Sequence, residues 1–175
     1  HVLSRRQRQM CIRDRGGVNP DLKLEWYTDL ISKLRISHPT IDLDCFSPIE
    51  IEGIAEVCDL STSEVLLSLK NAGMHGLPGG GAEMLVDSVR MDISPKKGSA
   101  DNWIRVMLEA QDIGLTTSAT NVIGFGESRS DRILHMDRIR TAQDHTISSG
   151  NIGFTSFISW PCLLYTSPSP RDGRE

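Results

Sequence analysis

Apolar positions along the chain switch between strand spacing and helix spacing, and this pattern predicts a repeated βα unit. Extended stretches are predicted at residues 40–46, 74–77, 115–123 and 154–160. One or two segments with helical spacing follow each of the first three. Parallel strands joined by right-handed crossovers form either a doubly wound sheet or a barrel. The sequence therefore predicts an α/β protein with a parallel sheet.

Loops rich in Gly, Ser, Asn and Glu come after strand positions, in the order GGVN, FSPIE, PGGGAE and GFGES. The first is interpreted as the loop that leaves a strand upstream of residue 16. Functional loops of a (β/α) barrel lie at the carboxyl ends of its strands, so this one-sided placement favours a barrel. In the 40–46 stretch, Asp42 and Asp44 alternate with apolar residues, which predicts a strand with one polar face.

The first helices are marked by residues that cap them. Asn19 is predicted as the N-cap of the first helix, with Pro20 at its first position. The Ser47 hydroxyl is expected to accept a hydrogen bond from the Glu50 N–H in a capping box, and Ser61 begins a second such box. The first helix carries apolar residues at i, i+3, i+4 and i+7, namely Tyr27, Leu30, Ile31 and Leu34.

Later helices are predicted from the same two features, a residue that caps the start and an apolar stripe. A helix is predicted over 82–89, directly after the glycines. The next begins at Ser99 or Asp101 and buries Trp103, Val106, Met107 and Ala110. A further helix runs from Ser128 or Ser130 to about residue 144, with its inward face formed by Ile133, Met136 and Ile139.

Three consecutive glycines at 79–81 are the best candidate for a binding loop. Residues without a Cβ let the backbone take positive φ and approach a ligand closely. At the start of a helix, free N–H groups and the helix dipole would both favour an anion. The alternative is a turn that only redirects the chain. The nearby 95–98 segment, with its two lysines, is either a solvated loop or a mobile cover over a site.

The two ends of the chain lack the pattern of the middle. Residues 162–167 can be coded by TGTCTCTTATACACATCT, and residues 9–15 by a string that contains its reverse complement, AGATGTGTATAAGAGACA. This pair resembles the mosaic-end sequence of transposase-based sequencing adapters. Residues 1–15 and 162–175 are therefore expected to be adapter-derived artefacts around a genuine segment, 16–161. The alternative is a basic arm that binds nucleic acid and a Pro/Ser-rich tail.

Charge and cysteine content narrow the class of protein. The chain has 19 basic and 23 acidic residues, and the segment 16–161 keeps 12 and 20 of them, a net charge of −8. This balance argues against nucleic acid and anionic membranes as partners, and favours a cytoplasmic protein. Membrane insertion is not expected, since no apolar run approaches the roughly 18 residues that a membrane span needs. Cys45 and Cys58 are predicted to be buried thiols. The spacing of His75, His135 and His145 suggests no metal site.

The order of motifs along 16–161 points to one family. It runs GGVNPDL, FSPIEI, LPGGGAEMLVDSVR, ISPKK, SADNWIRVMLEA, a TSAT strand, an RIRTAQD helix and GFTSFISWP. This series resembles the radical S-adenosylmethionine enzymes of the futalosine route to menaquinone. Within that family, the final Trp160-Pro161 favours the branch that cyclises dehypoxanthine futalosine.

The resemblance implies a fragment of a parallel (β/α) barrel of the radical S-adenosylmethionine type, lacking the N-terminal cluster-binding part. In that family a 4Fe-4S cluster on a CxxxCxxC loop, supplied by an electron donor, reduces S-adenosylmethionine to a 5′-deoxyadenosyl radical. The radical abstracts a ribose hydrogen from dehypoxanthine futalosine, and the carbon radical adds to a benzoate ring. Loss of an electron and a proton leaves a spirocyclic product. The 175 residues contain no CxxxCxxC, so the fragment itself is expected to be inactive.

The resemblance also implies roles for individual residues. The cofactor-binding residues would be Gly16, Gly17, Asn19 and Ser47. The substrate-binding residues would be Gly79, Gly80, Gly81, Glu83 and Glu127, with glycine amides holding a carboxylate. No catalytic residue is assigned. The chain departs from the family pattern at Phe125, where the family has His, and at Asp44-Cys45, where it has His-Ala.

Other functions remain open at this point. An aminofutalosine synthase or FO synthase sibling shares much of the motif series. A (β/α) barrel that binds phosphate or carboxylate without radical chemistry would use the same glycine loop. GGGAEM lacks the GxxxxGK of a P-loop, which argues against a nucleoside triphosphate site.

Overall fold

The computed structural model describes residues 11–14 and 19–162 of the 175-residue chain. Within these residues the strands form one parallel sheet, in the order β1-β2-β3-β4-β5. The strands are β1 (Cys11–Asp14), β2 (Asp42–Cys45), β3 (Gly76–Leu77), β4 (Thr116–Ile123) and β5 (Phe154–Pro161). This confirms the predicted α/β class. A doubly wound sheet reverses its strand order, whereas here the spatial order follows the chain, as it does in an arc of a barrel.

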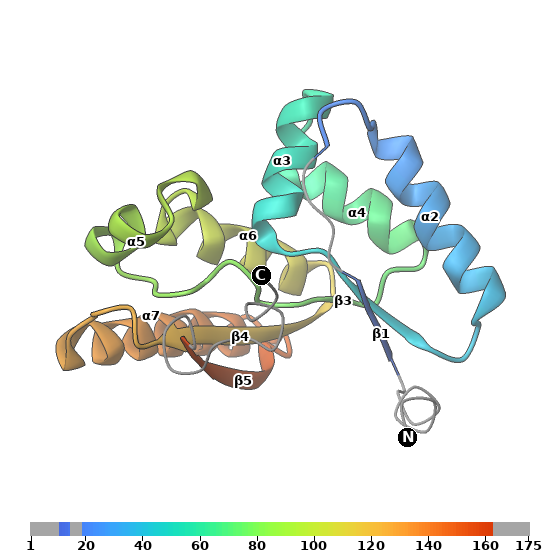
Figure 1. The fold of residues 1–175 in the computed structure, drawn as a ribbon. Helices are drawn as coiled ribbons and strands as arrows, with labels where there is room; N and C mark the ends of the chain where they lie inside the picture. Colours follow the sequence, from blue (N-terminus) through green and yellow to red (C-terminus); the bar gives the residue numbers. More distant parts are fainter. Residues whose placement is uncertain (1–10, 15–18, 163–175) are drawn as a thin grey trace, which may run out of the picture.

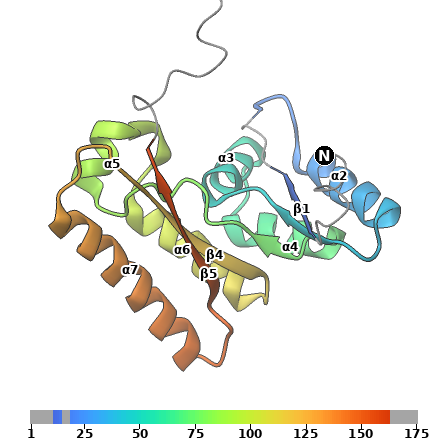
Figure 2. The same cartoon turned by 60° about the horizontal axis from the view of Figure 1, so that its bottom comes forward.

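Helices connect the strands and lie beside them (Figures 1 and 2). Helices α2, α3 and α4 lie near β1 to β3, and α6 and α7 near β4 and β5. Their bounds are α2 (Leu24–Ser37), α3 (Pro48–Cys58), α4 (Thr62–Ala72), α5 (Asp87–Ile93), the 3₁₀ turn η1 (Pro95–Lys97), α6 (Ala100–Asp112) and α7 (Arg129–Ser148). No helix in the described part of the chain is long and apolar enough to cross a membrane.

Strand β1 lies in the stretch that the sequence interpretation assigns to the adapter. Its backbone pairs in parallel with β2, from Cys11 opposite Asp42 to Asp14 opposite Cys45. An exposed strand edge accepts any extended backbone, because the pairing uses only N–H and C=O groups. The adapter origin of residues 1–15 stays a prediction.

The hydrophobic core lies between the sheet and the helices. Leu43 and Cys45 on β2 are fully buried, while Asp42 and Asp44 face the opposite side of the strand, as predicted. Cys58 is half-buried and packs against the core instead of lying within it. The largest fully buried side chains include Trp103, Ile31, Leu43, Ile51, Leu66 and Met107.

Several caps match the sequence prediction. Ser61 and Glu64 form the expected capping box, and Gly73 ends α4 in the left-handed conformation, with φ +115°. Ser99 caps α6, whose predicted stripe is buried at Trp103, Val106, Met107 and Ala110. Ser128 begins α7 with Asp131 as its partner. Each of these signals depends on residues within a few positions of one another, which a sequence pattern captures.

Two predicted caps are wrong in detail. Asn19 does not cap α2, because its side chain accepts from the Asp21 N–H at 3.0 Å and forms a turn before a helix that begins at Leu24. Ser47 does precede α3, but its hydroxyl donates to the Glu50 carboxylate at 2.6 Å instead of accepting from the backbone. A hydrogen bond from a hydroxyl to a carboxylate is charge-assisted. It is therefore stronger than the predicted hydrogen bond between a backbone N–H and the hydroxyl, in which both groups are neutral.

The segment after the glycines is not the predicted 82–89 helix. Residues 82–86 are irregular, and α5 begins only at Asp87. Glu83 has φ +37°, and its carbonyl accepts from the Val122 N–H at 2.8 Å. Tertiary hydrogen bonding to the end of β4 therefore overrides local helix propensity. The predicted anion site depends on a helix that starts directly after the glycines. Since no helix starts there, that prediction is also wrong.

Helix α7 is rotated relative to the prediction. Ile139 is buried as expected, but Ile133 is 70% exposed and Met136 is 46% exposed. The buried face consists of His135, Ile139, Ala142 and Thr146. Two polar anchors fix this face, because His135 accepts from the Leu85 N–H and Thr146 donates to Gln111.

Candidate functional site

The loops after β2, β3 and β4 lie at the carboxyl edge of the sheet. The loop after β3 passes close to the start of α3, since a Cβ on Gly81 would lie 2.6 Å from Ile49 Cγ1. Gly81 itself has φ +79°, a conformation that favours glycine. The structure therefore brings the FSPIE and PGGGAE motifs into contact.

Gly79 lies directly against strand β4. Its N–H donates to Ser118 Oγ at 3.1 Å, and its carbonyl accepts from the Thr120 hydroxyl. A Cβ at this position would lie 2.1 Å from the Ser118 carbonyl oxygen. The close approach of two backbones is therefore the physical reason for glycine here.

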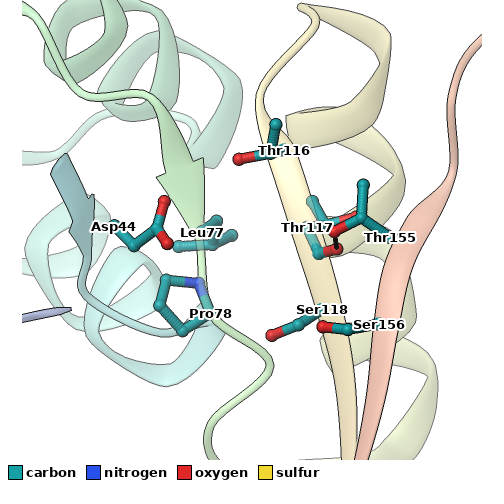
Figure 3. A pocket seen from close by; sticks show the side chains of 8 residues that line it. All are labelled: Asp44, Leu77, Pro78, Thr116, Thr117, Ser118, Thr155 and Ser156. Atoms are coloured by element: carbon teal, nitrogen blue, oxygen red, sulfur yellow. Dashed lines mark hydrogen bonds between the residues drawn. The ribbon is translucent and has the colours of Figure 1, made fainter. Parts of the chain in front are cut away.

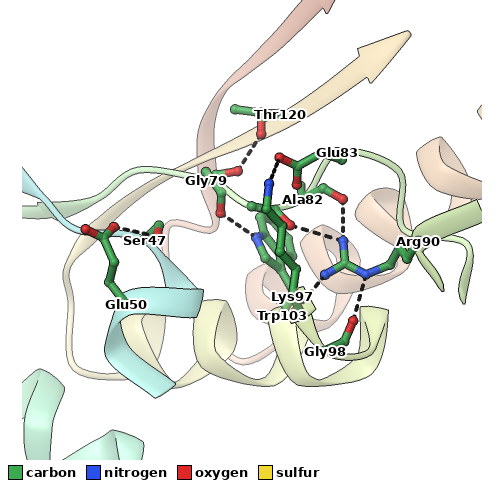
Figure 4. Close-up of polar contacts among 12 residues, drawn as sticks. Ser47, Glu50, Gly79, Ala82, Glu83, Arg90, Lys97, Gly98, Trp103 and Thr120 are labelled. Atoms are coloured by element: carbon green, nitrogen blue, oxygen red, sulfur yellow. Dashed lines mark hydrogen bonds and ion pairs between the residues drawn. The ribbon is translucent and has the colours of Figure 1, made fainter. Parts of the chain in front are cut away.

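The other carbonyls of the glycine loop accept hydrogen bonds from the side chains of Trp103 and Arg90 (Figure 4). Trp103 Nε1 donates to Gly80 O at 3.0 Å. Arg90 Nη1 donates to Gly81 O at 3.1 Å and to Ala82 O at 2.5 Å. Because these carbonyls already accept hydrogen bonds, a ligand would have to bind through N–H groups of the loop. None of the hydrogen bonds among the described residues uses the N–H of Gly80 or Gly81.

Arg90 joins the glycine loop to the segment that follows α5. Its Nη2 donates to Lys97 O at 3.0 Å, and its Nε donates to Gly98 O at 3.1 Å. The side chain is almost fully buried, and Figure 4 shows its guanidinium between Ala82 and Gly98. Burial lowers the pKa of Arg90, while nearby Glu83, Asp87 and Glu52 oppose that shift. A planar fork with five donors suits this role, which a lysine would not fill.

Glu83, which follows the glycine loop, forms an ion pair with Lys97 of η1. Glu83 Oε1 contacts Lys97 Nζ, while Glu83 Oε2 is buried and has no hydrogen-bond partner among the described residues. Lys97 is therefore a site residue that the sequence interpretation missed. Lys96, its neighbour, is exposed, and nothing in the sequence separates the two lysines.

His135 supports the same loop from α7. Its Nδ1 accepts from the Leu85 N–H at 2.9 Å, so the neutral ring carries its proton on Nε2. Burial, with a smaller contribution from the charge of Arg90, lowers the pKa of His135 to about 4. The Phe157 ring, which lies edge-to-face near the imidazole, completes its surroundings. His135 is thus a neutral, buried support for residues 83–86.

The loop after β4 uses Glu127 to hold itself together. The carboxylate accepts from the N–H groups of Gly124 and Phe125 and pairs with Arg132 at 2.7 Å. Burial raises the pKa of Glu127, but the backbone hydrogen bonds and Arg132 outweigh it, so that the pKa lies below its ordinary value. The hydrogen bonds of the Glu127 carboxylate within the described part of the chain are all local, and its role as a substrate ligand stays a prediction.

The residues expected to bind the cofactor are only partly described. Gly16 and Gly17 lie outside the described residues. Asn19 is exposed in a turn, and Ser47 is buried with its hydroxyl on Glu50. Their cofactor roles stay predictions. Among the described residues no group of three His, Cys, Asp or Glu is arranged to hold a metal ion. The described cysteines therefore do not fit an iron–sulfur cluster, and no chemical step is assigned to one.

A polar hollow of about 60 Å³ lies beside the end of β3, on the face of the sheet away from the core (Figure 3). Pro78, next to Gly79, forms part of its wall. Asp44 on β2 lies on one side, and hydroxyl groups from β4 and β5 lie on the other. The lining residues are Asp44, Leu77, Pro78, Thr116, Thr117, Ser118, Thr155 and Ser156.

Comparison with curated proteins decides the relationship. A cyclic dehypoxanthine futalosine synthase from Halalkalibacterium halodurans is 45% identical over 145 residues, which are 83% of this chain and 38% of that protein. An aminodeoxyfutalosine synthase from Thermus thermophilus is 36% identical over 143 residues, 82% of this chain and 37% of that protein. The chain is a homologue of the futalosine synthases. This confirms the resemblance drawn from the motifs of 16–161.

The homology extends to a further group of enzymes. A 5-amino-6-(D-ribitylamino)uracil–L-tyrosine 4-hydroxyphenyl transferase from Methanothermobacter thermautotrophicus is 34% identical over 172 residues, 98% of this chain and 45% of that protein. This futalosine synthase homologue spans less than half the length of each of these three relatives. No protein-family model matches the chain.

Proposed function

We propose that the full-length protein cyclises dehypoxanthine futalosine to cyclic dehypoxanthine futalosine, and that this chain supplies the part that holds the substrate. The glycine loop carries the proposal, because its carbonyls are fixed by Thr120, Trp103 and Arg90, while the N–H groups of Gly80 and Gly81 make no hydrogen bond among the described residues. The higher identity to the cyclic dehypoxanthine futalosine synthase, 45% against 36% and 34%, favours cyclisation.

The fold proposed for the full-length protein is a radical S-adenosylmethionine (β/α) barrel. The parallel sheet with strands in chain order supports it, and so does the placement of three loops at one edge. S-adenosylmethionine, a 4Fe-4S cluster and an electron donor would act in that protein. The cluster would be bound outside this chain, so the residues of this chain would bind and orient the reactants.

In this proposal the glycine loop binds the substrate carboxylate. The N–H groups of Gly80 and Gly81 would donate to it. Arg90 and Trp103 hold the loop from behind, so that little ordering is left to the moment of binding. A loop that is ordered before binding would hold the substrate in a fixed position. The entropic cost of orienting the reacting carbon atoms would then be met on binding and not during the reaction.

The test is an anaerobic assay of the full-length enzyme with a reconstituted cluster, S-adenosylmethionine, a reductant and dehypoxanthine futalosine. The expected product is lighter than the substrate by two hydrogen atoms and accumulates with 5′-deoxyadenosine. No consumption of this substrate would overturn the proposal.

A second candidate follows from the match that covers 98% of the chain. In parallel arms, the same enzyme is offered 5-amino-6-(D-ribitylamino)uracil with L-tyrosine, and formation of aminodeoxyfutalosine is also monitored. Activity in one of these arms alone would assign the protein to a sibling reaction. A barrel without radical chemistry predicts no 5′-deoxyadenosine in any arm.

A further inference from the structure

The carboxyl ends of β4 and β5 carry apolar side chains on the face of the sheet that meets the glycine loop. Thr120 defines this face, because its hydroxyl donates to Gly79 O. Successive side chains of a strand lie on opposite faces, so Val122 shares the face of Thr120. The strand register places Ile158 opposite Thr120 and Trp160 opposite Val122. Val122, Ile158 and Trp160 therefore form one apolar patch at the carboxyl edge.

This apolar patch lies beside the backbone that follows the glycines. The Val122 N–H donates to Glu83 O at 2.8 Å, which fixes the end of β4 against the residue two positions after Gly81. Nearer the amino ends of the two strands, the same face carries hydroxyl groups, on Ser118 and on Ser156 opposite it. The apolar patch is therefore confined to the end of the strands where the glycine loop runs.

Trp160 is the most exposed member of the apolar patch. It is 56% exposed, whereas Val122 and Ile158 are half-buried. Trp103 shows the opposite case, since it is fully buried, donates to Gly80 O and stacks on Phe154. No ring contact or side-chain hydrogen bond within the described part of the chain involves Trp160. Its indole therefore has ring surface to offer a ligand.

The face on which Trp160 lies is set by the pairing of β5 with β4. The register runs from Phe154 opposite Thr117 to Pro161 opposite Ile123. A further strand beside β5 would pair through backbone groups and leave this register unchanged. Only a shift by one residue would move the indole to the other face of the sheet. Trp160 therefore keeps its place beside the glycine loop in a longer sheet.

We propose that Trp160 stacks on the aromatic ring of the substrate, an aromatic carboxylate whose carboxylate group is held by the glycine loop. The inference rests on the proposed function, in which the substrate carries a benzoate. In a benzoate the carboxylate is attached directly to the ring, so an anchored carboxylate keeps the ring close to the loop. A ring placed over the hydroxyl groups of Ser118 and Ser156 would cut them off from water. On the apolar patch it meets an indole and two aliphatic side chains instead.

The test measures dissociation constants by calorimetry on the unreduced full-length enzyme, which needs no turnover. The probes are dehypoxanthine futalosine, an analogue with a cyclohexane ring in place of its benzene ring, and S-adenosylmethionine. The wild type is expected to bind the aromatic compound about 3- to 10-fold more tightly than the saturated one, as a stacked aromatic pair contributes. Trp160→Leu should lose this preference, whereas Trp160→Phe, which keeps an aromatic ring, should retain most of it.

Trp26→Leu is the matched control, because Trp26 is 47% exposed on α2 and its ring contacts Tyr27 edge-to-face. Its affinities should equal those of the wild type. If Trp160→Leu fails to fold in a thermal unfolding test, tryptophan fluorescence of Trp160→Phe replaces it. Dehypoxanthine futalosine should remove less fluorescence intensity from Trp160→Phe than from the wild type. An equal loss of intensity in both proteins overturns the stacking.

The remaining outcomes separate the two proposals. A wild-type enzyme that binds the aromatic and the saturated compound equally overturns the stacking and leaves the proposed function standing. A preference that persists in Trp160→Leu does the same. A loss of affinity for S-adenosylmethionine alone in Trp160→Leu assigns the indole to the cofactor and also overturns the stacking. A wild-type enzyme that does not bind dehypoxanthine futalosine overturns the proposed function itself.

Discussion

At the scale of single residues, Gly79 shows how one position sets the path of the loop. A Cβ there would lie 2.1 Å from the Ser118 carbonyl oxygen, which is backbone and cannot turn away. Gly79→Ala is therefore expected to lower the free energy of unfolding by about 2–3 kcal/mol, the cost of overpacking a fitted site. Urea denaturation measures this difference.

The control for Gly79 is Gly150→Ala. Gly150 has φ +86°, and a Cβ added there would meet no atom within 4 Å, so this substitution should cost only about 1 kcal/mol. A Gly79→Ala protein as stable as the wild type would show that the loop does not depend on this close approach.

The Glu83–Lys97 pair is the second prediction at this scale. Both side chains are partly buried, so the pair should contribute more than an exposed one, with a coupling energy of about 1 kcal/mol. A double-mutant cycle of Glu83→Gln and Lys97→Met, read by urea unfolding, measures this coupling. The same cycle with Lys96→Met in place of Lys97→Met is the control and should give a value near zero. Equal coupling for both lysines would contradict the contact.

His135 predicts a dependence of stability on pH. The pKa of His135 lies near 4 in the folded protein and near 6.5 when unfolded, so the unfolded chain binds the proton more readily. Stability is therefore complete above pH 6.5 and falls as the pH drops towards 4, by at most about 3 kcal/mol. Unfolding free energies measured between pH 7 and 4.5 should show this slope in the wild type. His135→Gln should show a shallower slope, because only carboxylates with a lowered pKa, such as Glu127, then lose stability at low pH. An equal slope in both proteins would contradict the assignment.

At the scale of elements, Arg90 ties three segments together. Its guanidinium donates to carbonyls of Gly81, Ala82, Lys97 and Gly98. Arg90→Lys keeps the charge and loses the fork, so amide hydrogen exchange should quicken in 79–86 and 94–99. Arg140→Lys, which changes an exposed pair with Asp144 on α7, is the control and should leave those segments unchanged. Unaltered exchange in Arg90→Lys would show that the loop holds its shape without this side chain.

The elements also show what the sequence can and cannot predict. The prediction for helix α6 is close, because its cap at Ser99 and its apolar stripe are local features. The prediction for the face of α7 is wrong, because that face is set by His135 and Thr146 bonding to residues 50 and 35 positions away. The absence of a helix directly after the glycines likewise depends on Val122 and Arg90. Local patterns do not contain such partners.

The site follows the same division. The glycine loop and its place at the carboxyl edge are predictable from residue type and order. Lys97, Arg90 and Trp103 as its supports are not, since their roles come from packing between α5, η1 and α6. Glu127 is a residue that the sequence predicts at the substrate. In the structure its carboxylate accepts hydrogen bonds from N–H groups of its own loop.

At the scale of the whole molecule, β5 is the last strand of the sheet among the described residues. Phe157 is 40% exposed and Trp160 is 56% exposed on this last strand of the described sheet. Beside it, Met136, Ile139 and Phe157 line a groove of about 270 Å³ between α7 and β5. On the opposite side of the sheet, β1 pairs with β2. A longer barrel, of which this chain would be one part, would cover the β5 side with its next βα unit.

Residues 16–161 are thus expected to belong to a longer radical S-adenosylmethionine enzyme whose cluster loop lies upstream. Long-read sequencing of the source DNA across codon 16 decides whether they do. We expect an uninterrupted reading frame that replaces residues 1–15 with other sequence and contains CxxxCxxC before Gly16. A reading frame that encodes residues 1–15 as they stand, with no CxxxCxxC upstream, would contradict this expectation.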